Sequence, residues 1–293
     1  MKKQLLLTCI FILSSMQLYS QNRGSALNLM IKAEYDFAVQ TGEVGIRDGF
    51  LKFIDDSAVV FNPAPVNGKE YYTAAKPSKA YLSWYPEFAR TSKSGDLGVT
   101  SGPWYYKKNK EDLDTLACGT FCSIWKQSAA GIWKFVVDIG TDNARPVKPI
   151  PGVKYKNDEI KSSKDNPKID GKLNLEYLIG LEKELAKKAG EVGLSTAYKN
   201  NIAAESRIQK DGEFPLKSKT EISSYLSGIE GQLEIIPVNG GASRSEDFGY
   251  TYGTLKIKSS KNELKEYYYL HVWQYENGQF KLLVEVLKNK EAK

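Results

Sequence analysis

Two carboxylates and one histidine are the side chains of this sequence that are best suited to proton-transfer chemistry. The chain contains two similar halves, and Asp138 and Glu285 occupy the same point in the last strand-like segment of each half. A carboxyl group that faces an apolar cavity has a raised pKa and can act as an acid or base near neutral pH. His271 is the only histidine, and its unperturbed pKa is already close to neutrality. Asp138 and His271 are therefore the first candidates for catalytic residues.

The alternation of side chains along the last strand gives a different interpretation of the carboxylates. Trp133 and Phe135 fall on one face, whereas Lys134 and Asp138 fall on the other. Unless a bulge changes the register, Asp138 is expected to point away from the apolar face, toward solvent or the other half of the chain. The same pattern places Glu285 outward, so a polar structural role is favoured for both acids.

His271 lies on a predicted strand that carries Tyr267, Tyr269 and Trp273 on the same face. It is a candidate general base with a tyrosine hydroxyl as its partner. The favoured alternative is a histidine that is hydrogen-bonded within an aromatic cluster. Its equivalent in the first half is Ser123, for which the sequence shows no histidine and acid partners, so a catalytic triad is not supported.

The two halves are recognised by segments that return after about 150 residues. A period of this length is far longer than that of solenoid or propeller repeats, so each copy is expected to be a whole domain. The returning segments are 42–45 as 190–193, 94–102 as 245–253, and Trp125 as Trp273. The glycines of 42–45 and 190–193 lack the spacing of a phosphate-binding loop and are expected to form a turn between two helices.

Each copy is predicted to begin with helices and to continue with strands. Apolar residues recur at helical spacing at Leu29, Ala33 and Phe37, and again at Leu178, Leu181 and Leu185. Short links between the later segments have hairpin lengths, which indicates antiparallel pairing. Helices segregated ahead of an antiparallel sheet define an α+β domain. The predicted strands are 82–89, 98–106, 115–126 and 132–139, and then 232–238, 249–257, 266–275 and 279–287.

The N-terminal segment has the order of a secretory signal peptide. Met1-Lys2-Lys3 precedes an apolar run over 5–13 that is too short to span a bilayer, and serine-containing sequence follows. We therefore expect residues 1–20 to be removed and the protein to be exported to the periplasm or the extracellular space. Residues 22–140 are predicted to form the first domain, 141–171 a linker rich in proline and lysine, and 172–289 a second, diverged domain.

Charge and cysteine content exclude several classes of function. Loss of Lys2 and Lys3 lowers the formal charge from +6 to +4, without the dense basic stripe that nucleic-acid binding requires. No later segment has the length of a membrane span. Cys118 and Cys122 are too far apart along an extended strand to bridge each other unless the strand breaks at Gly119. Two cysteines without partner histidines make a poor metal site, so neither a metal nor a cofactor is expected.

The first copy resembles the nuclear-transport-factor-2-like superfamily, which includes ketosteroid isomerases, polyketide cyclases and scytalone dehydratase. The resemblance rests on segments 53–61, 94–104, 123–126 and 131–140. It implies cone-shaped domains, each with a strongly curved sheet wrapped over helices around a pocket. In ketosteroid isomerases an aspartate precedes the proline that corresponds to Pro63, but this chain has Asn62, and an amide is not a base at neutral pH. Isomerase catalysis of that type is therefore not inherited.

The same resemblance implies which residues line a pocket in the first domain. Phe61 and Trp104 lie on segments that border the pocket in relatives, and Asn62 and Trp125 are the further candidates. For Asn62 a turn position ahead of Pro63 is the favoured alternative. Aromatic side chains are in excess in the predicted strands of the first copy, and two or three of them are expected to face a cavity while the rest form the core.

Three functions remain open at this point. The favoured one is a small-ligand-binding or scaffold module that binds an apolar molecule in the first domain, and the sequence leans against an enzyme. The second is an enzyme of isomerase, dehydratase or cyclase type that uses an acid, histidine or tyrosine in one cavity. The third is a structural or partner-binding protein with filled pockets. Because single-copy relatives pair through their sheets, the two domains are also expected to pair with each other as an internal pseudo-dimer.

Overall fold

The computed structural model describes residues 26–143, 173–227, 229, 231–259 and 263–290. The predicted signal peptide and the linker residues 144–171 lie outside these ranges. We call residues 26–143 the first domain and the described residues from 173 to 290 the second domain. A helix over residues 26–44 opens the first domain. The other elements are α2 (Ile46–Phe53), β1 (Ile54–Asn62), β2 (Ala64–Asn67), α3 (Gly68–Ala74), β3 (Tyr81–Trp84), β4 (Phe88–Thr91), β5 (Leu97–Lys107), β6 (Ala117–Gln127), β7 (Trp133–Asp142), α4 (Leu175–Val192), α5 (Leu194–Asn201), β8 (Ile202–Lys210), α6 (Lys219–Ser227), β9 (Gln232–Ala242), β10 (Phe248–Lys258), β11 (Leu264–Glu276) and β12 (Gln279–Asn289).

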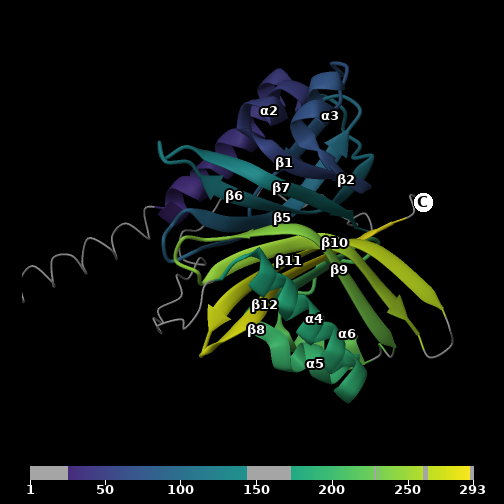
Figure 1. The fold of residues 1–293 in the computed structure, drawn as a ribbon. Helices are drawn as coiled ribbons and strands as arrows, with labels where there is room; N and C mark the ends of the chain where they lie inside the picture. The colour runs from purple at the N-terminus through teal and green to yellow at the C-terminus, as the bar shows by residue number, and fades with distance from the viewer. Residues whose placement is uncertain (1–25, 144–172, 228, 230, 260–262, 291–293) are drawn as a thin grey trace, which may run out of the picture.

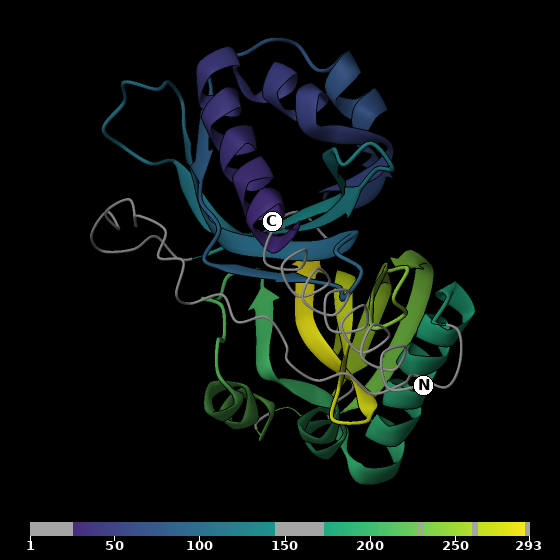
Figure 2. The ribbon, with the colours of Figure 1, turned by 90° about the vertical axis from the view of Figure 1, so that its left-hand side faces the viewer.

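Both domains have the predicted α+β architecture, in which helices pack on the concave face of a curved sheet. Figure 1 shows α2 and α3 on the far side of the first sheet and α4 to α6 on the far side of the second, with the two sheets facing each other. Figure 2 shows how each sheet curls around its helices. Among the described residues, no helix is both long and apolar enough to cross a membrane.

Glycine turns separate the helices at the predicted places in both domains. Gly45 has φ 91° and precedes α2, and Gly193 has φ 83° and precedes α5. Glycine adopts this positive φ without the steric penalty of a side chain. Both helices end where the chain becomes extended, at Ile54 and Ile202, which begin β1 and β8. The first strand of each sheet therefore follows directly from a helix, without an intervening loop.

The sheets are mixed, because the first strand of each domain pairs in parallel with the last. The strand orders are β2-β1-β7-β6-β5-β3, with β4 also paired to β5, and β8-β12-β11-β10-β9. The other pairings are antiparallel, as predicted. The predicted strand 82–89 is two strands, β3 and β4, which flank a bend at residues 85–87. A Cβ at Gly102 would lie 2.0 Å from the Tyr85 carbonyl oxygen, so glycine permits this close approach.

In the first turns of the first helix, the buried face is shifted by one position from the predicted face. Leu29 was expected to face the core, but it is 48% exposed. The buried positions include Met30, Glu34, Phe37 and Thr41, which also follow helical spacing. The helix therefore presents a carboxyl group to the core, a feature that a search for apolar residues alone overlooks.

A bulge in the last strand of each domain overturns the outward placement of the two acids. Ile124 of β6 pairs with Val137, but Trp125 pairs with Phe135, so Val136 is an extra residue in β7. Side chains beyond the bulge change faces. Trp133 and Phe135 point to the helices as expected, whereas Asp138 turns inward rather than outward. The second domain has the same bulge in β12, because Val272 pairs with Val284 but Trp273 pairs with Leu282. Leu283 is the extra residue, and Glu285 turns inward as well.

Because of these bulges, apolar side chains on the convex faces of the two sheets form one shared core. The cluster combines the two domains in nearly equal numbers and includes Val99, Ile124 and Ile139 with Leu270, Val272 and Val286, each at most 1% exposed. Arg90 forms an ion pair with Glu205 across the same boundary. The domains are therefore in contact through buried apolar surface, which supplies the main favourable free energy of such contacts.

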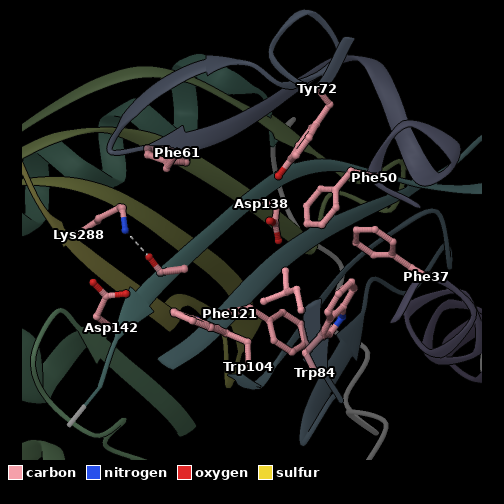
Figure 3. A pocket seen from close by; sticks show the side chains of 12 residues that line it. Phe37, Phe50, Phe61, Tyr72, Trp84, Trp104, Phe121, Asp138, Asp142 and Lys288 are labelled. Carbon is pink, nitrogen blue, oxygen red and sulfur yellow. Dashed lines mark hydrogen bonds between the residues drawn. The ribbon is translucent and has the colours of Figure 1, made fainter. Parts of the chain in front are cut away.

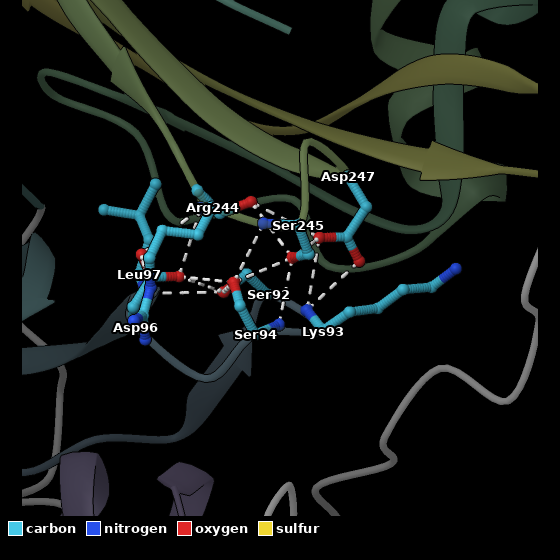
Figure 4. Close-up of polar contacts among 9 residues, drawn as sticks. Ser92, Lys93, Ser94, Asp96, Leu97, Arg244, Ser245 and Asp247 are labelled. Carbon is cyan, nitrogen blue, oxygen red and sulfur yellow. Dashed lines mark hydrogen bonds and ion pairs between the residues drawn. The ribbon is translucent and has the colours of Figure 1, made fainter. Parts of the chain in front are cut away.

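Two equivalent loops contact each other reciprocally at one end of this interface (Figure 4). The backbone amide of Lys93 donates to the Asp247 carboxylate at 3.1 Å, and that of Arg244 donates to Asp96 at 3.2 Å. Ser94 and Ser245 lie 2.8 Å apart through their hydroxyl oxygens. Each loop thus binds the other through its equivalent aspartate, Asp96 in the first domain and Asp247 in the second. This is the arrangement expected of a two-fold symmetric contact.

Replacement of Asp247 with alanine is expected to lower the free energy of unfolding by about 1–3 kcal/mol. The change removes the acceptor of the Lys93 amide across the interface and of Ser243 and Ser245 in its own loop. Urea unfolding measures the effect, with the exposed Asp114→Ala as the control. An Asp247→Ala midpoint equal to that of the control would contradict the importance of the reciprocal loop contact.

Candidate functional site

The first domain contains a cavity of about 230 Å³ between its helices and the concave face of its sheet. An engineered cavity of about 150 Å³ is large enough to bind benzene, so this one has room for a two-ring molecule. Most of its wall is aromatic, and the helices and strands contribute to it alike (Figure 3). The aromatic lining residues are Phe37, Phe50, Phe61, Tyr72, Trp84, Trp104 and Phe121.

Asp138 is one of two acids in the lining of this cavity; the other is Asp142. Asp138 is brought there by the bulge in β7, and the Ser123 hydroxyl on β6 donates to its Oδ1 at 2.7 Å. Burial raises the pKa of Asp138 to about 6, while the hydrogen bond from Ser123 and the charge of Lys288 lower it. Among the described residues, no group donates to its Oδ2. Asp138 can therefore exchange a proton near neutral pH or accept a hydrogen bond from a ligand.

Tyr72 and Lys288 add polar groups on two sides of the cavity. Figure 3 shows the Tyr72 hydroxyl pointing toward Asp138. Burial, together with the Asp138 charge, raises the pKa of Tyr72 well above its usual value, so the phenol stays protonated. Lys288 comes from β12 of the second domain, and its ammonium group donates to the Gly140 carbonyl oxygen at 2.7 Å. The cavity wall is thus completed by a residue of the other domain.

The sequence-predicted pocket residues separate into two pairs. Phe61 and Trp104 line the cavity. Trp104 fits closely beside Gly119, where a Cβ would lie 2.6 Å from the indole ring. Asn62 is not among the lining residues; it ends β1, and its side-chain amide donates to the Tyr71 hydroxyl at 2.9 Å. Trp125 is fully buried behind the wall. Of the tryptophans in the strands of the first domain, Trp84 and Trp104 line the cavity.

Trp125 belongs to a buried hydrogen-bond network centred on Glu34, which the sequence analysis did not identify. The Glu34 carboxylate accepts from Trp84 Nε1 at 2.6 Å, Trp125 Nε1 at 2.8 Å and Thr100 Oγ1 at 2.5 Å. Burial raises the pKa of Glu34 to about 7, against the lowering effect of these three bonds. Glu34 binds donors from β3, β5 and β6, so it fixes the helix of residues 26–44 onto the sheet beside the cavity.

The second domain contains the equivalent network around Glu182, extended by the only histidine. Glu182 accepts from Thr251 Oγ1 at 2.5 Å and from Trp273 Nε1 at 2.7 Å. His271 bridges the two acids, with Nδ1 2.8 Å from Glu182 and Nε2 2.8 Å from Glu285. Burial lowers the pKa of His271, but the charges and hydrogen bonds of both acids more than offset this and raise it to about 9. His271 is therefore a buried cation between two carboxylates.

The acid of the last strand has different hydrogen-bond partners in the two domains. Ser123 and Asp138 are cross-strand partners in the first domain, as are His271 and Glu285 in the second. Glu285 also accepts from the Tyr198 hydroxyl at 2.7 Å and is 3% exposed. Tyr198 stands where the first domain has Phe50, and His271 stands where it has Ser123, so larger polar side chains enclose this acid. His271 has no contact with the cavity of the first domain, and its partners satisfy both ring nitrogens.

The described residues contain no cluster of three or more histidine, cysteine or acidic side chains arranged to hold a metal ion. Cys118 and Cys122 lie on the same unbroken strand, β6, as predicted, and both are buried. The ionisable side chains of the cavity are Asp138, Asp142 and Tyr72 of the first domain and Lys288 of the second, against aromatic walls.

Comparisons with known proteins concern the fold. No family model matches the chain, and no curated protein matches it. A nuclear-transport-factor-2-like protein of unknown function from Shewanella oneidensis is 12% identical, with 37% of this chain and 94% of that one covered and a TM-score of 0.32. One from Pseudomonas putida is 11% identical, with 39% and 84% covered and a TM-score of 0.32. A Δ5-3-ketosteroid isomerase from Mycobacterium is 8% identical, with 37% and 90% covered and a TM-score of 0.30. The first two of these are described as nuclear-transport-factor-2-like, the superfamily that the sequence resembles, and the likeness concerns the fold alone.

Proposed function

We propose that the first domain binds a small, mainly apolar molecule in its cavity and holds one polar group of that molecule through Asp138. The observation that carries this proposal is an aromatic cavity of about 230 Å³ into which the bulge in β7 turns the Asp138 carboxyl group. Cavities of this kind take their affinity from apolar walls and their orientation from a few polar groups. Asp138 Oδ2 and the Tyr72 hydroxyl are the groups that set the orientation.

We further propose that the second domain serves mainly as a scaffold and that the two domains form an internal pair. Its support is the shared apolar cluster between the sheets and the reciprocal contacts of the two loops. The Glu285 carboxylate, enclosed by Tyr198 and His271, also supports a structural role, because both residues contact its Oε2 within the same domain. Export of the protein remains the proposal that the leader-like N-terminus supports.

An enzyme of isomerase, dehydratase or cyclase type is the second candidate. The observation that favours it is the Asp138 carboxyl group, whose pKa of about 6 lies near the working pH of most proteins, beside a tyrosine that stays protonated. An acid of this pKa is well matched to moving a proton, with the tyrosine able to donate a hydrogen bond to a developing oxyanion. In this candidate Asp138 takes the part that Asn62 does not supply.

The binding proposal is tested by filling the cavity. Leu82 lines it, and Leu82→Trp places a large side chain into the space. We expect 2-naphthol to quench the tryptophan fluorescence of the wild-type protein in a saturable way and to lose at least tenfold in affinity for Leu82→Trp. Leu113→Trp is the matched control, because Leu113 is 97% exposed. Equal binding to the wild type and to both variants would refute a binding role for this cavity.

The affinity for 2-naphthol is expected to depend on pH through Asp138. An ionised carboxylate accepts a hydrogen bond from the naphthol hydroxyl more strongly than a neutral carboxyl does, so affinity should rise roughly fivefold to tenfold between pH 5 and pH 7.5. This range spans the Asp138 pKa of about 6. Asp138→Asn keeps the shape of the side chain and should abolish the dependence. Isothermal titration calorimetry across this range measures both proteins, and parallel curves would show that another group titrates.

A further inference from the structure

We propose that the second domain completes the binding site and that Lys288 selects molecules that carry a carboxylate at the end remote from Asp138. This inference rests on the proposed function, since it concerns the same cavity. It assigns a specificity role to a residue of the domain that otherwise acts as a scaffold.

The ammonium group of Lys288 lies at the cavity with unused hydrogen-bonding capacity. It has three protons, and its one hydrogen bond to a residue that the structure describes goes to the Gly140 carbonyl oxygen. Among the described residues, no carboxylate oxygen lies within the 4.0 Å that defines an ion pair with it. Lys288 is partly buried, and a partly buried cation is stabilised by an anionic partner. A ligand carboxylate would fill this position.

The strand that separates Lys288 from Asp138 sets the length of the ligand. Lys288 is bound at Gly140, two residues beyond Asp138 on β7, and both residues line the cavity. Two residues of a strand span about 7 Å. A two-ring molecule with a hydroxyl at one end and a carboxylate at the other therefore reaches both groups while its rings contact Trp84, Trp104 and Phe121.

The second domain also shapes the cavity through Phe61. The Phe61 ring packs against Tyr252 with centroids 6.0 Å apart and against Tyr268 with centroids 6.4 Å apart. The position of this wall thus depends on the same domain that supplies Lys288. Asp138 and Asp142 are the other charged residues of the lining, and their carboxylates oppose the binding of an anion. The charge preference of the site therefore tests directly whether Lys288 or the two acids dominate.

The experiment measures three two-ring probes on the full chain at pH 7.5, namely 6-hydroxy-2-naphthoate, 2-naphthol and the cationic 6-hydroxy-2-naphthylmethylammonium. We expect the carboxylate to bind at least tenfold more tightly than 2-naphthol, and the cation to bind most weakly. Lys288→Met should remove the tenfold preference for the carboxylate over 2-naphthol. Lys288→Arg should retain the preference, because it keeps the charge.

Lys290→Met is the matched control, since Lys290 pairs with Glu266 on β11 and does not line the cavity. Tighter binding of the cation, or an equal loss of all three probes in Lys288→Met, would overturn the inference and leave the proposed function standing. Failure of every probe to bind the wild-type protein would instead refute the proposed function itself.

Discussion

Replacement of Glu34 with alanine is expected to destabilise the protein by about 3–5 kcal/mol, a large part of the 5–15 kcal/mol that stabilises a typical domain. Three buried donors, Trp84 Nε1, Trp125 Nε1 and Thr100 Oγ1, lose their common acceptor, and Trp125 Nε1 keeps only its hydrogen bond to Thr100 Oγ1. An unpaired buried donor costs about 1–3 kcal/mol, and the missing side chain leaves a void as well. The unfolding midpoint in urea measures the change.

Two comparisons separate the network from the helix that carries it. Glu43→Ala alters an exposed acid of the same helix and should shift the midpoint little. Glu34→Gln keeps the volume and one acceptor oxygen, so its loss should be intermediate. A Glu34→Ala protein as stable as Glu43→Ala would show that the donors find other partners and that Glu34 does not hold the helix to the sheet.

Most of the fold was accessible from the sequence because it depends on local patterns. Hairpin-length links and alternating residues predicted the antiparallel strands, and the glycines at 45 and 193 predicted the turns between helices. The parallel pairing of β1 with β7 and of β8 with β12 was not predicted, since it joins residues about 80 positions apart. A pairing of that kind leaves no signal in neighbouring residues.

The site was harder to predict because one inserted residue decides it. Strict alternation placed Asp138 and Glu285 outward, and only the extra residues Val136 and Leu283 turn them inward. A bulge of this type has no sequence signature in a run of apolar residues. The pairing of Ser123 with Asp138, and of His271 with Glu285, follows once the bulge is known.

The buried glutamates did leave a signal. Glu34 and Glu182 stand 148 residues apart, the same spacing as Trp125 and Trp273, the tryptophans that donate to them. An acid at the same position in the apolar face of the first helix of each copy indicates that it has a buried hydrogen-bond partner there. A comparison of the halves for shared polar residues, in addition to shared glycines and aromatics, would have identified the network.

The second large effect is expected at His271. His271→Ala leaves Glu182 and Glu285 buried without the cation that both contact at 2.8 Å. Breaking a buried ion pair by removal of one partner costs about 3–5 kcal/mol. Urea unfolding at pH 7 measures the loss, and Tyr267→Phe, on the same strand, tests whether any change of a buried polar side chain has the same result. A loss no larger than that of Tyr267→Phe would contradict a charged His271.

The pH dependence of stability provides a signature that a merely packed histidine would not give. The pKa of His271 is raised in the folded protein from 6.5 to about 9. Its contribution to stability is therefore fully present below pH 6.5 and is lost as the pH rises through about 9, on the order of 3 kcal/mol in all. Glu34 and Asp138 have pKa values raised to about 7 and about 6, so stability also falls as the pH rises through these lower values.

The wild-type protein should therefore become less stable in steps as the pH rises from 5 to 9.5, and His271→Ala should lack the last step. The matched variant His271→Gln keeps one hydrogen bond without a charge, so it should also lack the step while it recovers part of the stability. Persistence of the fall between pH 7 and pH 9.5 in both variants would assign it to another group. Because the cluster is confined to the second domain, the affinity for 2-naphthol should remain within twofold of wild type wherever these variants are folded.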